Sequence, residues 1–112
     1  MPRTETFRFK SGETRRKIPY QITDIDGNPE DLSNVTSVTF SMDGPDGSSV
    51  VTDASATTED ATNGEVSYQL SSGDTGTTGI HTAEFRVEFQ DGSVGIYPRF
   101  ADLEIHVKEP VN

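Results

Sequence analysis

Apolar and polar residues alternate with a period of two along most of the chain. The clearest stretch covers residues 83–89, where Ala, Phe, Val and Phe occupy the odd positions and Glu, Arg and Glu the even positions. Successive side chains of a strand point to opposite faces of a sheet, so this pattern predicts a strand with one buried and one solvated face. No helical period competes with it, and the chain is expected to fold into β-sheets.

Tight-turn signals separate the alternating stretches. Asp-Gly pairs begin at positions 26, 43, 46 and 91, and an Asn-Gly pair begins at 63. These residues tolerate the positive φ angles of tight turns. The polar connection Asp53–Asn63 is expected to be a surface loop. We predict strands over Thr6–Lys10, Lys17–Thr23, Val35–Met42, Ser49–Asp53, Gly64–Leu70, Gly79–Phe89, Ser93–Tyr97 and Leu103–Lys108.

The strand count and the chain length together predict the architecture. Short strands separated by turns favour an all-β fold, an immunoglobulin-like β-sandwich of about seven to eight strands. A chain of 112 residues has the size of one domain. We expect one sandwich over 1–112, with a basic N-terminal strand or arm at 1–17 and an acidic body at 18–110. The predicted core is Phe9, Ile18, Tyr20, Ile22, Val38, Phe40, Val66, Tyr68, Leu70, Phe85, Val87, Phe89, Ile105 and Val107.

The chain has no cysteine, and 30% of its residues are hydrophobic. Disulfides and Cys-based zinc sites are therefore excluded, and stability must come from packing. No apolar run approaches the length that spans a bilayer. We expect a soluble protein that does not contact a membrane.

The composition is strongly acidic, with 19 acidic and 9 basic residues and a net charge of −10. This charge disfavours binding to a nucleic-acid backbone. An acidic surface poor in lysine is also expected of a protein that must stay hydrated in concentrated salt, where screening removes much of the self-repulsion. A halophilic source is our preferred explanation, and an ordinary acidic domain is the alternative.

The order and spacing of several segments resemble a known family. The chain is similar to the immunoglobulin-like N-terminal domain of the baseplate upper protein family of tailed phages. The resemblance lies in the segments Thr23–Ser33, Ser37–Met42, Gly64–Tyr68, Gly79–Val87, Asp91–Ser93 and Tyr97–Pro98.

The resemblance implies a part of a virion, assembled in the host cytoplasm, with other virion proteins as partners. The chain is expected to form a homo-oligomer or to be present in several copies in a symmetric assembly. Members of the family attach to the tail baseplate. Taken together with the acidic composition, the resemblance suggests a tailed virus of a halophilic host. Attachment at the tail or baseplate is the first hypothesis, and a capsid or neck decoration protein is the second. A carbohydrate or cell-surface binding module is a third hypothesis, weakened by the absence of tryptophan.

Candidate ligand sites are few, and no catalytic constellation is recognised. Asp24, Asp26 and Asn28 begin like an EF-hand loop, but Pro29 stands where that loop needs glycine, so a β-turn is the favoured interpretation and cation binding stays open. The Gly-rich stretch 72–79 lacks the Gly-Lys-Ser/Thr ending of a phosphate-binding loop.

Two histidines complete the candidates. His81 and His106 are expected to be exposed on strands, opposite in phase to the core residues. A metal site formed by both histidines and a carboxylate is the alternative if their strands are neighbours. Glu84 and Glu88, with Arg86 between them, are interpreted as a charged outer face. We therefore expect no enzymatic activity, no cofactor and no resident metal.

The basic residues are concentrated at one end of the chain. Residues 1–17 contain six basic and two acidic side chains, a net charge of +4, whereas the remainder contains three basic and seventeen acidic side chains, a net charge of −14. The basic side chains either protect an edge strand or form a docking surface for acidic neighbours. The predicted docking surface is Arg3, Phe7, Arg8, Lys10, Arg15, Arg16 and Lys17.

The halophile hypothesis predicts stabilisation by salt. The melting temperature, followed by circular dichroism, should rise as KCl is raised from dilute to molar levels, because the Debye length shrinks to about 3 Å at 1 M and like charges no longer repel. A melting temperature that is flat or falls with KCl would contradict the hypothesis.

Overall fold

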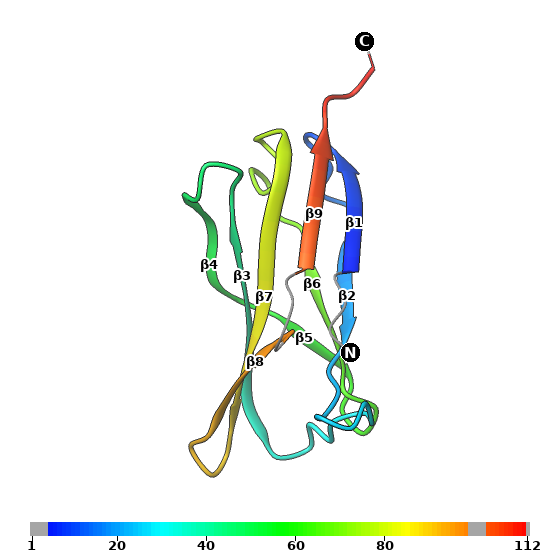
Figure 1. The fold of residues 1–112 in the computed structure, drawn as a ribbon, viewed down its shortest axis with the longest axis vertical. Helices are drawn as coiled ribbons and strands as arrows, with labels where there is room; N and C mark the ends of the chain where they lie inside the picture. Colours follow the sequence, from blue (N-terminus) through cyan, green and yellow to red (C-terminus); the bar gives the residue numbers. More distant parts are fainter. Residues whose placement is uncertain (1–4, 99–102, 112) are drawn as a thin grey trace.

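The computed structural model describes residues 5–98 and 103–111. Nine strands lie within these ranges, and most of them coincide with the alternating stretches of the sequence (Figure 1). The strands are β1 (Glu5–Lys10), β2 (Lys17–Gln21), β3 (Val35–Asp43), β4 (Ser49–Ser55), β5 (Thr57–Asp60), β6 (Glu65–Gln69), β7 (Gly79–Phe89), β8 (Val94–Tyr97) and β9 (Leu103–Lys108).

The strands form two sheets that enclose one core. The larger sheet has the order β1-β9-β7-β3-β4, and β8 pairs with β7 below the end of β9. The smaller sheet has the order β2-β6-β5. Within the described strands, β1 and β9 form the one parallel pair, and it brings the first and last strands of the chain together. The all-β, immunoglobulin-like sandwich predicted from the sequence is confirmed.

One predicted loop is in part a strand. The prediction of a surface loop over Asp53–Asn63 is wrong, because β4 continues to Ser55 and β5 pairs antiparallel with β6, with Thr58 opposite Val66. Three of the four β5 side chains are exposed and polar, so no alternation of apolar residues marks it in the sequence. Backbone hydrogen bonds to β6 define this strand.

The predicted core is largely confirmed. Twelve of the fourteen residues are buried, and the other two, Tyr20 and Phe89, are half-buried and pack against the core. The buried hydrophobic residues that the sequence analysis did not include are mostly at strand ends and in connections, where alternation is short. They are Leu32, Met42, Val51, Ala83, Tyr97 and Leu103.

Four aromatic rings join the two sheets at the centre. Phe40 and Phe85 project from the larger sheet, and their ring centroids lie 5.1 Å apart in an edge-to-face contact. The Tyr68 ring of the smaller sheet stacks on Phe40 with a centroid distance of 4.2 Å. Tyr20 of the smaller sheet stacks on Phe85 at 6.0 Å. Such pairs contribute about 0.5–1.5 kcal/mol each beyond the area they bury.

The central position of Phe85 predicts unequal effects of two neighbouring substitutions. Phe85→Ala should lower the free energy of unfolding by about 3–5 kcal/mol, because it removes a fully buried ring and leaves a cavity. Glu84→Ala, on the exposed face of the same strand, should change it by no more than about 0.5 kcal/mol. Equal losses in urea unfolding would overturn this assignment of faces.

Candidate docking site

The basic N-terminal residues lie on and beside an edge strand. β1 is the terminal strand of the larger sheet, and its burial alternates so that Phe7 and Phe9 face inward while Arg8 and Lys10 are exposed on the outer face. The structure thus divides the predicted docking surface between two faces of β1. Arg3, which the sequence analysis included, lies outside the described residues.

Two of the predicted docking residues make contacts within the fold. The Arg16 guanidinium lies over the ring of Phe9, 4.9 Å from its centroid, and Nη1 donates to the Arg8 carbonyl oxygen at 3.2 Å. Lys17 Nζ lies 3.0 Å from Glu59 Oε2. Arg16 therefore covers the core and caps the strand edge, which is the protective role weighed for these residues.

Two further predicted docking residues, Arg8 and Lys10, form a cluster with a residue of β9 that the sequence did not reveal, whereas Arg15 is exposed in the connection between β1 and β2. In the parallel pair, Arg8 lies opposite His106 and Lys10 lies opposite Lys108. Arg8, Lys10 and Lys108 are exposed, and His106 is half-buried with its Nε2 3.0 Å from Glu104 Oε1. We refer to Arg8, Lys10 and Lys108 as the basic corner. Lysines directly opposite each other repel, so this surface favours an anionic partner.

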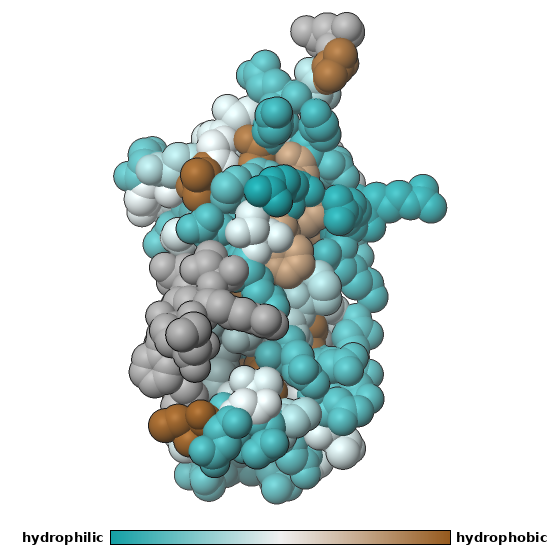
Figure 2. Space-filling model, turned by 45° about the vertical axis from the view of Figure 1, so that its right-hand side comes forward, coloured by the Kyte–Doolittle hydropathy of each residue, from teal (hydrophilic) through white to brown (hydrophobic). Residues whose placement is uncertain are grey.

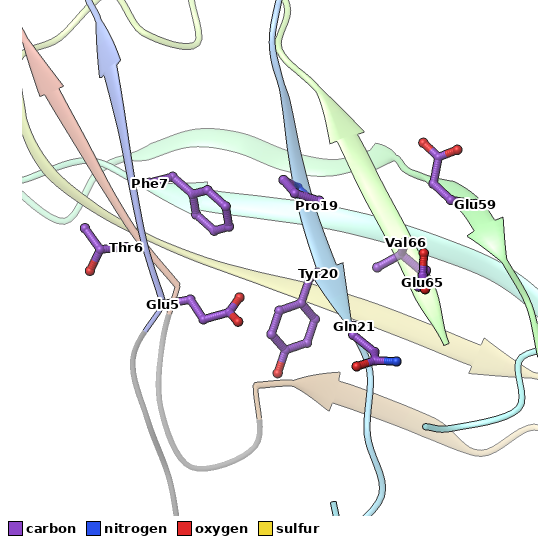
Figure 3. A pocket seen from close by; sticks show the side chains of 9 residues that line it. All are labelled: Glu5, Thr6, Phe7, Pro19, Tyr20, Gln21, Glu59, Glu65 and Val66. Carbon is purple, nitrogen blue, oxygen red and sulfur yellow. The ribbon is translucent and has the colours of Figure 1, made fainter. Parts of the chain in front are cut away.

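A groove lies on the other side of β1, between it and β2. It has a volume of about 550 Å³ and is open to solvent. Figure 3 shows the side chains of Phe7 and Tyr20 turned into the space between the two strands, with the Glu5 carboxylate directed toward the Tyr20 ring. The lining residues are Glu5, Thr6, Phe7, Pro19, Tyr20, Gln21, Glu59, Glu65 and Val66.

Four strands line the groove, and they contribute both aromatic rings and carboxylates. Of the lining residues, only Phe7 was predicted as a site residue. Glu59 accepts a hydrogen bond from the Ser67 hydroxyl at 2.5 Å, and this bond, with that from Lys17, lowers the pKa of the Glu59 carboxyl. Glu59 is thus held ionised at the rim. Glu59 and Glu65 are distant from Phe7 in sequence, so no local pattern could predict the site.

The candidate calcium loop uses its carboxylate internally. Asp24 Oδ1 accepts hydrogen bonds from the backbone N–H groups of Asp26 at 2.9 Å and Asn28 at 3.0 Å. Thr23 and Pro29 close this turn as an isolated antiparallel bridge. The side chain therefore stabilises a turn, as the β-turn interpretation expects. Within residues 5–98 and 103–111, no three His, Asp or Glu side chains are grouped so that they could hold a metal ion.

The buried side chain of Asp74 holds the Gly-rich stretch 72–79 in place through hydrogen bonds. Asp74 is buried, and its Oδ2 accepts hydrogen bonds from the Tyr68 hydroxyl at 2.6 Å and from the Ser71 N–H at 2.8 Å. Burial and the bond to Asp74 raise the pKa of Tyr68 to about 12. The Asp74 carboxylate thus satisfies the hydroxyl of a core tyrosine, which is a structural role.

The two histidines lie on opposite faces of the larger sheet. β7 and β9 are neighbours, but His81 pairs with Ile105, and His106 with Ile80. His106 faces outward as predicted. The prediction of an exposed His81 is wrong: it is fully buried, because residue 81 shares its parity with Ala83 and Phe85. A metal site made by both rings is incompatible with this register.

The comparisons with known proteins concern the fold. No protein-family model matches the sequence, and no curated protein matches it. Among solved structures, CopC from Methylosinus trichosporium OB3b is similar, with a TM-score of 0.58 and 15% sequence identity over 96% of this chain and 88% of that one. At this identity the likeness shows a shared β-sandwich. No helix in the described part of the chain is long and apolar enough to cross a membrane.

His81 predicts a stabilising substitution. Neither of its ring nitrogens has a hydrogen-bond partner among the described residues. Because an unsatisfied buried polar group costs about 1–3 kcal/mol, His81→Leu, which has a similar volume and no polar atoms, should raise the free energy of unfolding by about 1 kcal/mol or more. Urea unfolding measures the change, and a clear loss of stability would contradict the prediction.

Proposed function

We propose that this chain is a non-enzymatic structural protein of a tailed virus particle, which attaches or connects parts at the tail or baseplate. The proposal draws the virion and the baseplate from the family resemblance of the sequence. The likeness to CopC contributes the fold alone and says nothing for or against this role. The feature of the structure that carries the proposal is the basic corner.

The basic corner stands out because the rest of the chain is so acidic. Between Lys17 and Arg86 there is no lysine or arginine at all. Three exposed cations gathered on β1 and β9 therefore give one edge of the sandwich a potential opposite to that of the rest of the surface. Complementary potentials steer two proteins into one orientation and fix their register. An acidic neighbouring subunit is the partner that fits.

The surroundings of the basic corner suit a contact that works in concentrated salt. Molar salt screens exposed ion pairs, so a contact of this kind needs desolvation or apolar packing as well. The long aliphatic stems of Arg8, Lys10 and Lys108 supply apolar surface beside their charges. The corner can therefore contribute binding energy that screening does not remove.

The basic corner would serve equally well in a capsid or neck decoration protein, because that hypothesis changes only the acidic partner to which the corner binds. A carbohydrate-binding module is less well supported. Such modules stack sugars on exposed aromatic side chains, whereas the Phe7 and Tyr20 rings of the groove are half-buried and the exposed large hydrophobic residues within the described ranges are all aliphatic. They are Ile25, Ile80, Val94, Ile96 and Val111.

Removing the basic corner should impair incorporation into particles without unfolding the domain. The double variant Arg8→Ser with Lys10→Ser should reduce the copies per purified particle by at least about tenfold, the change that about 1.4 kcal/mol of lost contact energy produces. Its melting temperature should stay near that of the wild type, because both side chains are exposed.

Arg86→Ser is the matched control, since Arg86 lies on the same sheet and faces outward, away from the corner. It should leave the copy number unchanged. If the double variant folds and is incorporated at the wild-type level, the basic corner is not the attachment surface and the proposed function loses its structural support.

A further inference from the structure

The two lateral sides of the sandwich differ in how they are closed. On one side the chain passes from β4 directly to β5 through Ala56, so one continuous segment joins the two sheets. On the other side β1 and β2 are the terminal strands of their sheets, and only the connection 11–16 joins them, at one end. Figure 2, which brings this side of the molecule forward, shows a largely hydrophilic surface with apolar atoms at its centre. The groove lies in this open side.

In the C-terminal half of β1, hydrogen bonds within the chain already occupy backbone groups of the open edge. The Lys10 N–H donates to Glu13 Oε1 at 2.6 Å, and the Lys10 carbonyl accepts from the Glu13 N–H at 3.1 Å. The Arg8 carbonyl accepts from Arg16, as described above. These bonds show that the even-numbered residues of β1 direct their backbone groups away from β9 and toward the open side.

Among the described residues, three backbone groups of this edge have no partner. Because N–H and C=O directions alternate along a strand, the groups of Thr6 also point to the open side, and so does the Arg8 N–H. They form a short row of two donors and one acceptor beside the groove. An extended segment can pair with such a row by adding one strand to the sheet.

The edge of β2 is a poorer template. Its even-numbered residues pair with β6, as shown by the bonds from Leu70 N–H to the Arg16 carbonyl and from Ile22 N–H to the Gly64 carbonyl. The odd-numbered residues face the open side, and the central one is Pro19, which has no N–H. Proline on an edge strand discourages pairing. Strand addition is therefore directed to β1.

The side chains of the groove select a cation. Three of its nine lining residues are glutamates, and none carries a positive charge. Lys17 reaches Glu59 from outside the lining, and Glu65 adds a carboxylate of its own. The Phe7 and Tyr20 rings present π surfaces to the same space. Carboxylates beside aromatic faces bind a guanidinium or ammonium group through ion pairing and cation–π attraction.

We propose that the groove binds an extended segment of a partner protein, which pairs with β1 at Thr6 and Arg8 and places an arginine or lysine side chain between Phe7, Tyr20 and the glutamates. Side chains of an added strand alternate between the two faces of the sheet. Those on the inner face enter the groove, and those on the outer face lie beside Arg8 and Lys10. The segment therefore carries basic residues alternating with polar or acidic ones. This inference goes beyond the proposed function, and it concerns the groove on the inner side of β1, which adjoins the basic corner on the outer side.

The test uses two synthetic peptides and the purified chain. Acetyl-Thr-Arg-Thr-Arg-Thr-amide and acetyl-Thr-Glu-Thr-Glu-Thr-amide are titrated at low ionic strength, and backbone amide signals are followed by ¹⁵N NMR. The arginine peptide should shift the signals of Thr6, Phe7, Arg8 and Val66, and the glutamate peptide, whose carboxylates the groove repels, should give much smaller shifts at Phe7 and Val66. Equal shifts with both peptides, or none with either, would overturn the proposal.

Variants separate the side-chain and backbone parts of the site. Glu65→Gln should weaken binding of the arginine peptide by about threefold or more, whereas Glu84→Gln, on the exposed outer face of β7, should leave it unchanged. Thr6→Pro removes one open-edge N–H and should weaken binding in the same way while the fold is kept. Identical affinities for all three variants would refute the site.

A second copy of the chain is the alternative occupant. If the Thr6 and Phe7 signals move with protein concentration in the absence of peptide, the groove is a self-association surface and the proposal is wrong. These measurements involve no particle. Their failure would leave the basic corner untouched, and failure of particle incorporation would leave the groove untouched.

Discussion

The contact of aromatic rings between the two sheets is the interaction on which the other features depend. Phe40 stacks on Tyr68 and meets Phe85 edge to face, and Tyr20 stacks on the other side of Phe85. Without a disulfide, this cluster and the aliphatic residues around it hold the sheets together. Tyr20 also lines the groove, so the core and the candidate site share a side chain. One wall of the groove is therefore packed against the core.

The parallel pairing of β1 with β9 determines where the charges gather. It places Lys108, close to the end of the sequence, opposite Lys10. The same pairing leaves the other edge of β1 open toward β2, where Glu5 and Phe7 turn inward. One short strand thus separates a cationic outer surface from an anionic groove, because its side chains alternate. A partner that adds a strand here meets both potentials at once, and this constrains its register as well as its composition.

The sequence was sufficient for the fold and for most of the core. Alternation identifies a strand only when one face is buried, which is why Phe85 and Ile105 were assigned correctly and the polar strand β5 was missed. Applied consistently, the same parity would also have placed His81 inside, two residues before Ala83. The site was predictable only in part. The basic corner needs Lys108 and the groove needs Glu59 and Glu65, and each depends on strand pairing that a single sequence does not reveal.

Protection and recognition are compatible on the same edge, because they occupy different halves of it. An uncovered β1 would offer a full row of backbone groups to any extended chain, a known cause of aggregation. Glu13 and Arg16 cap the C-terminal half of β1, and Pro19 gives the facing strand no N–H at its centre. Within the described part of the chain, only the backbone groups at Thr6 and Arg8 then remain for pairing. A segment that pairs there gains few backbone hydrogen bonds, so its affinity must come from side chains in the groove. Discrimination then follows from charge: a segment with acidic inner residues would bring them against the glutamates at a cost that so few hydrogen bonds do not offset.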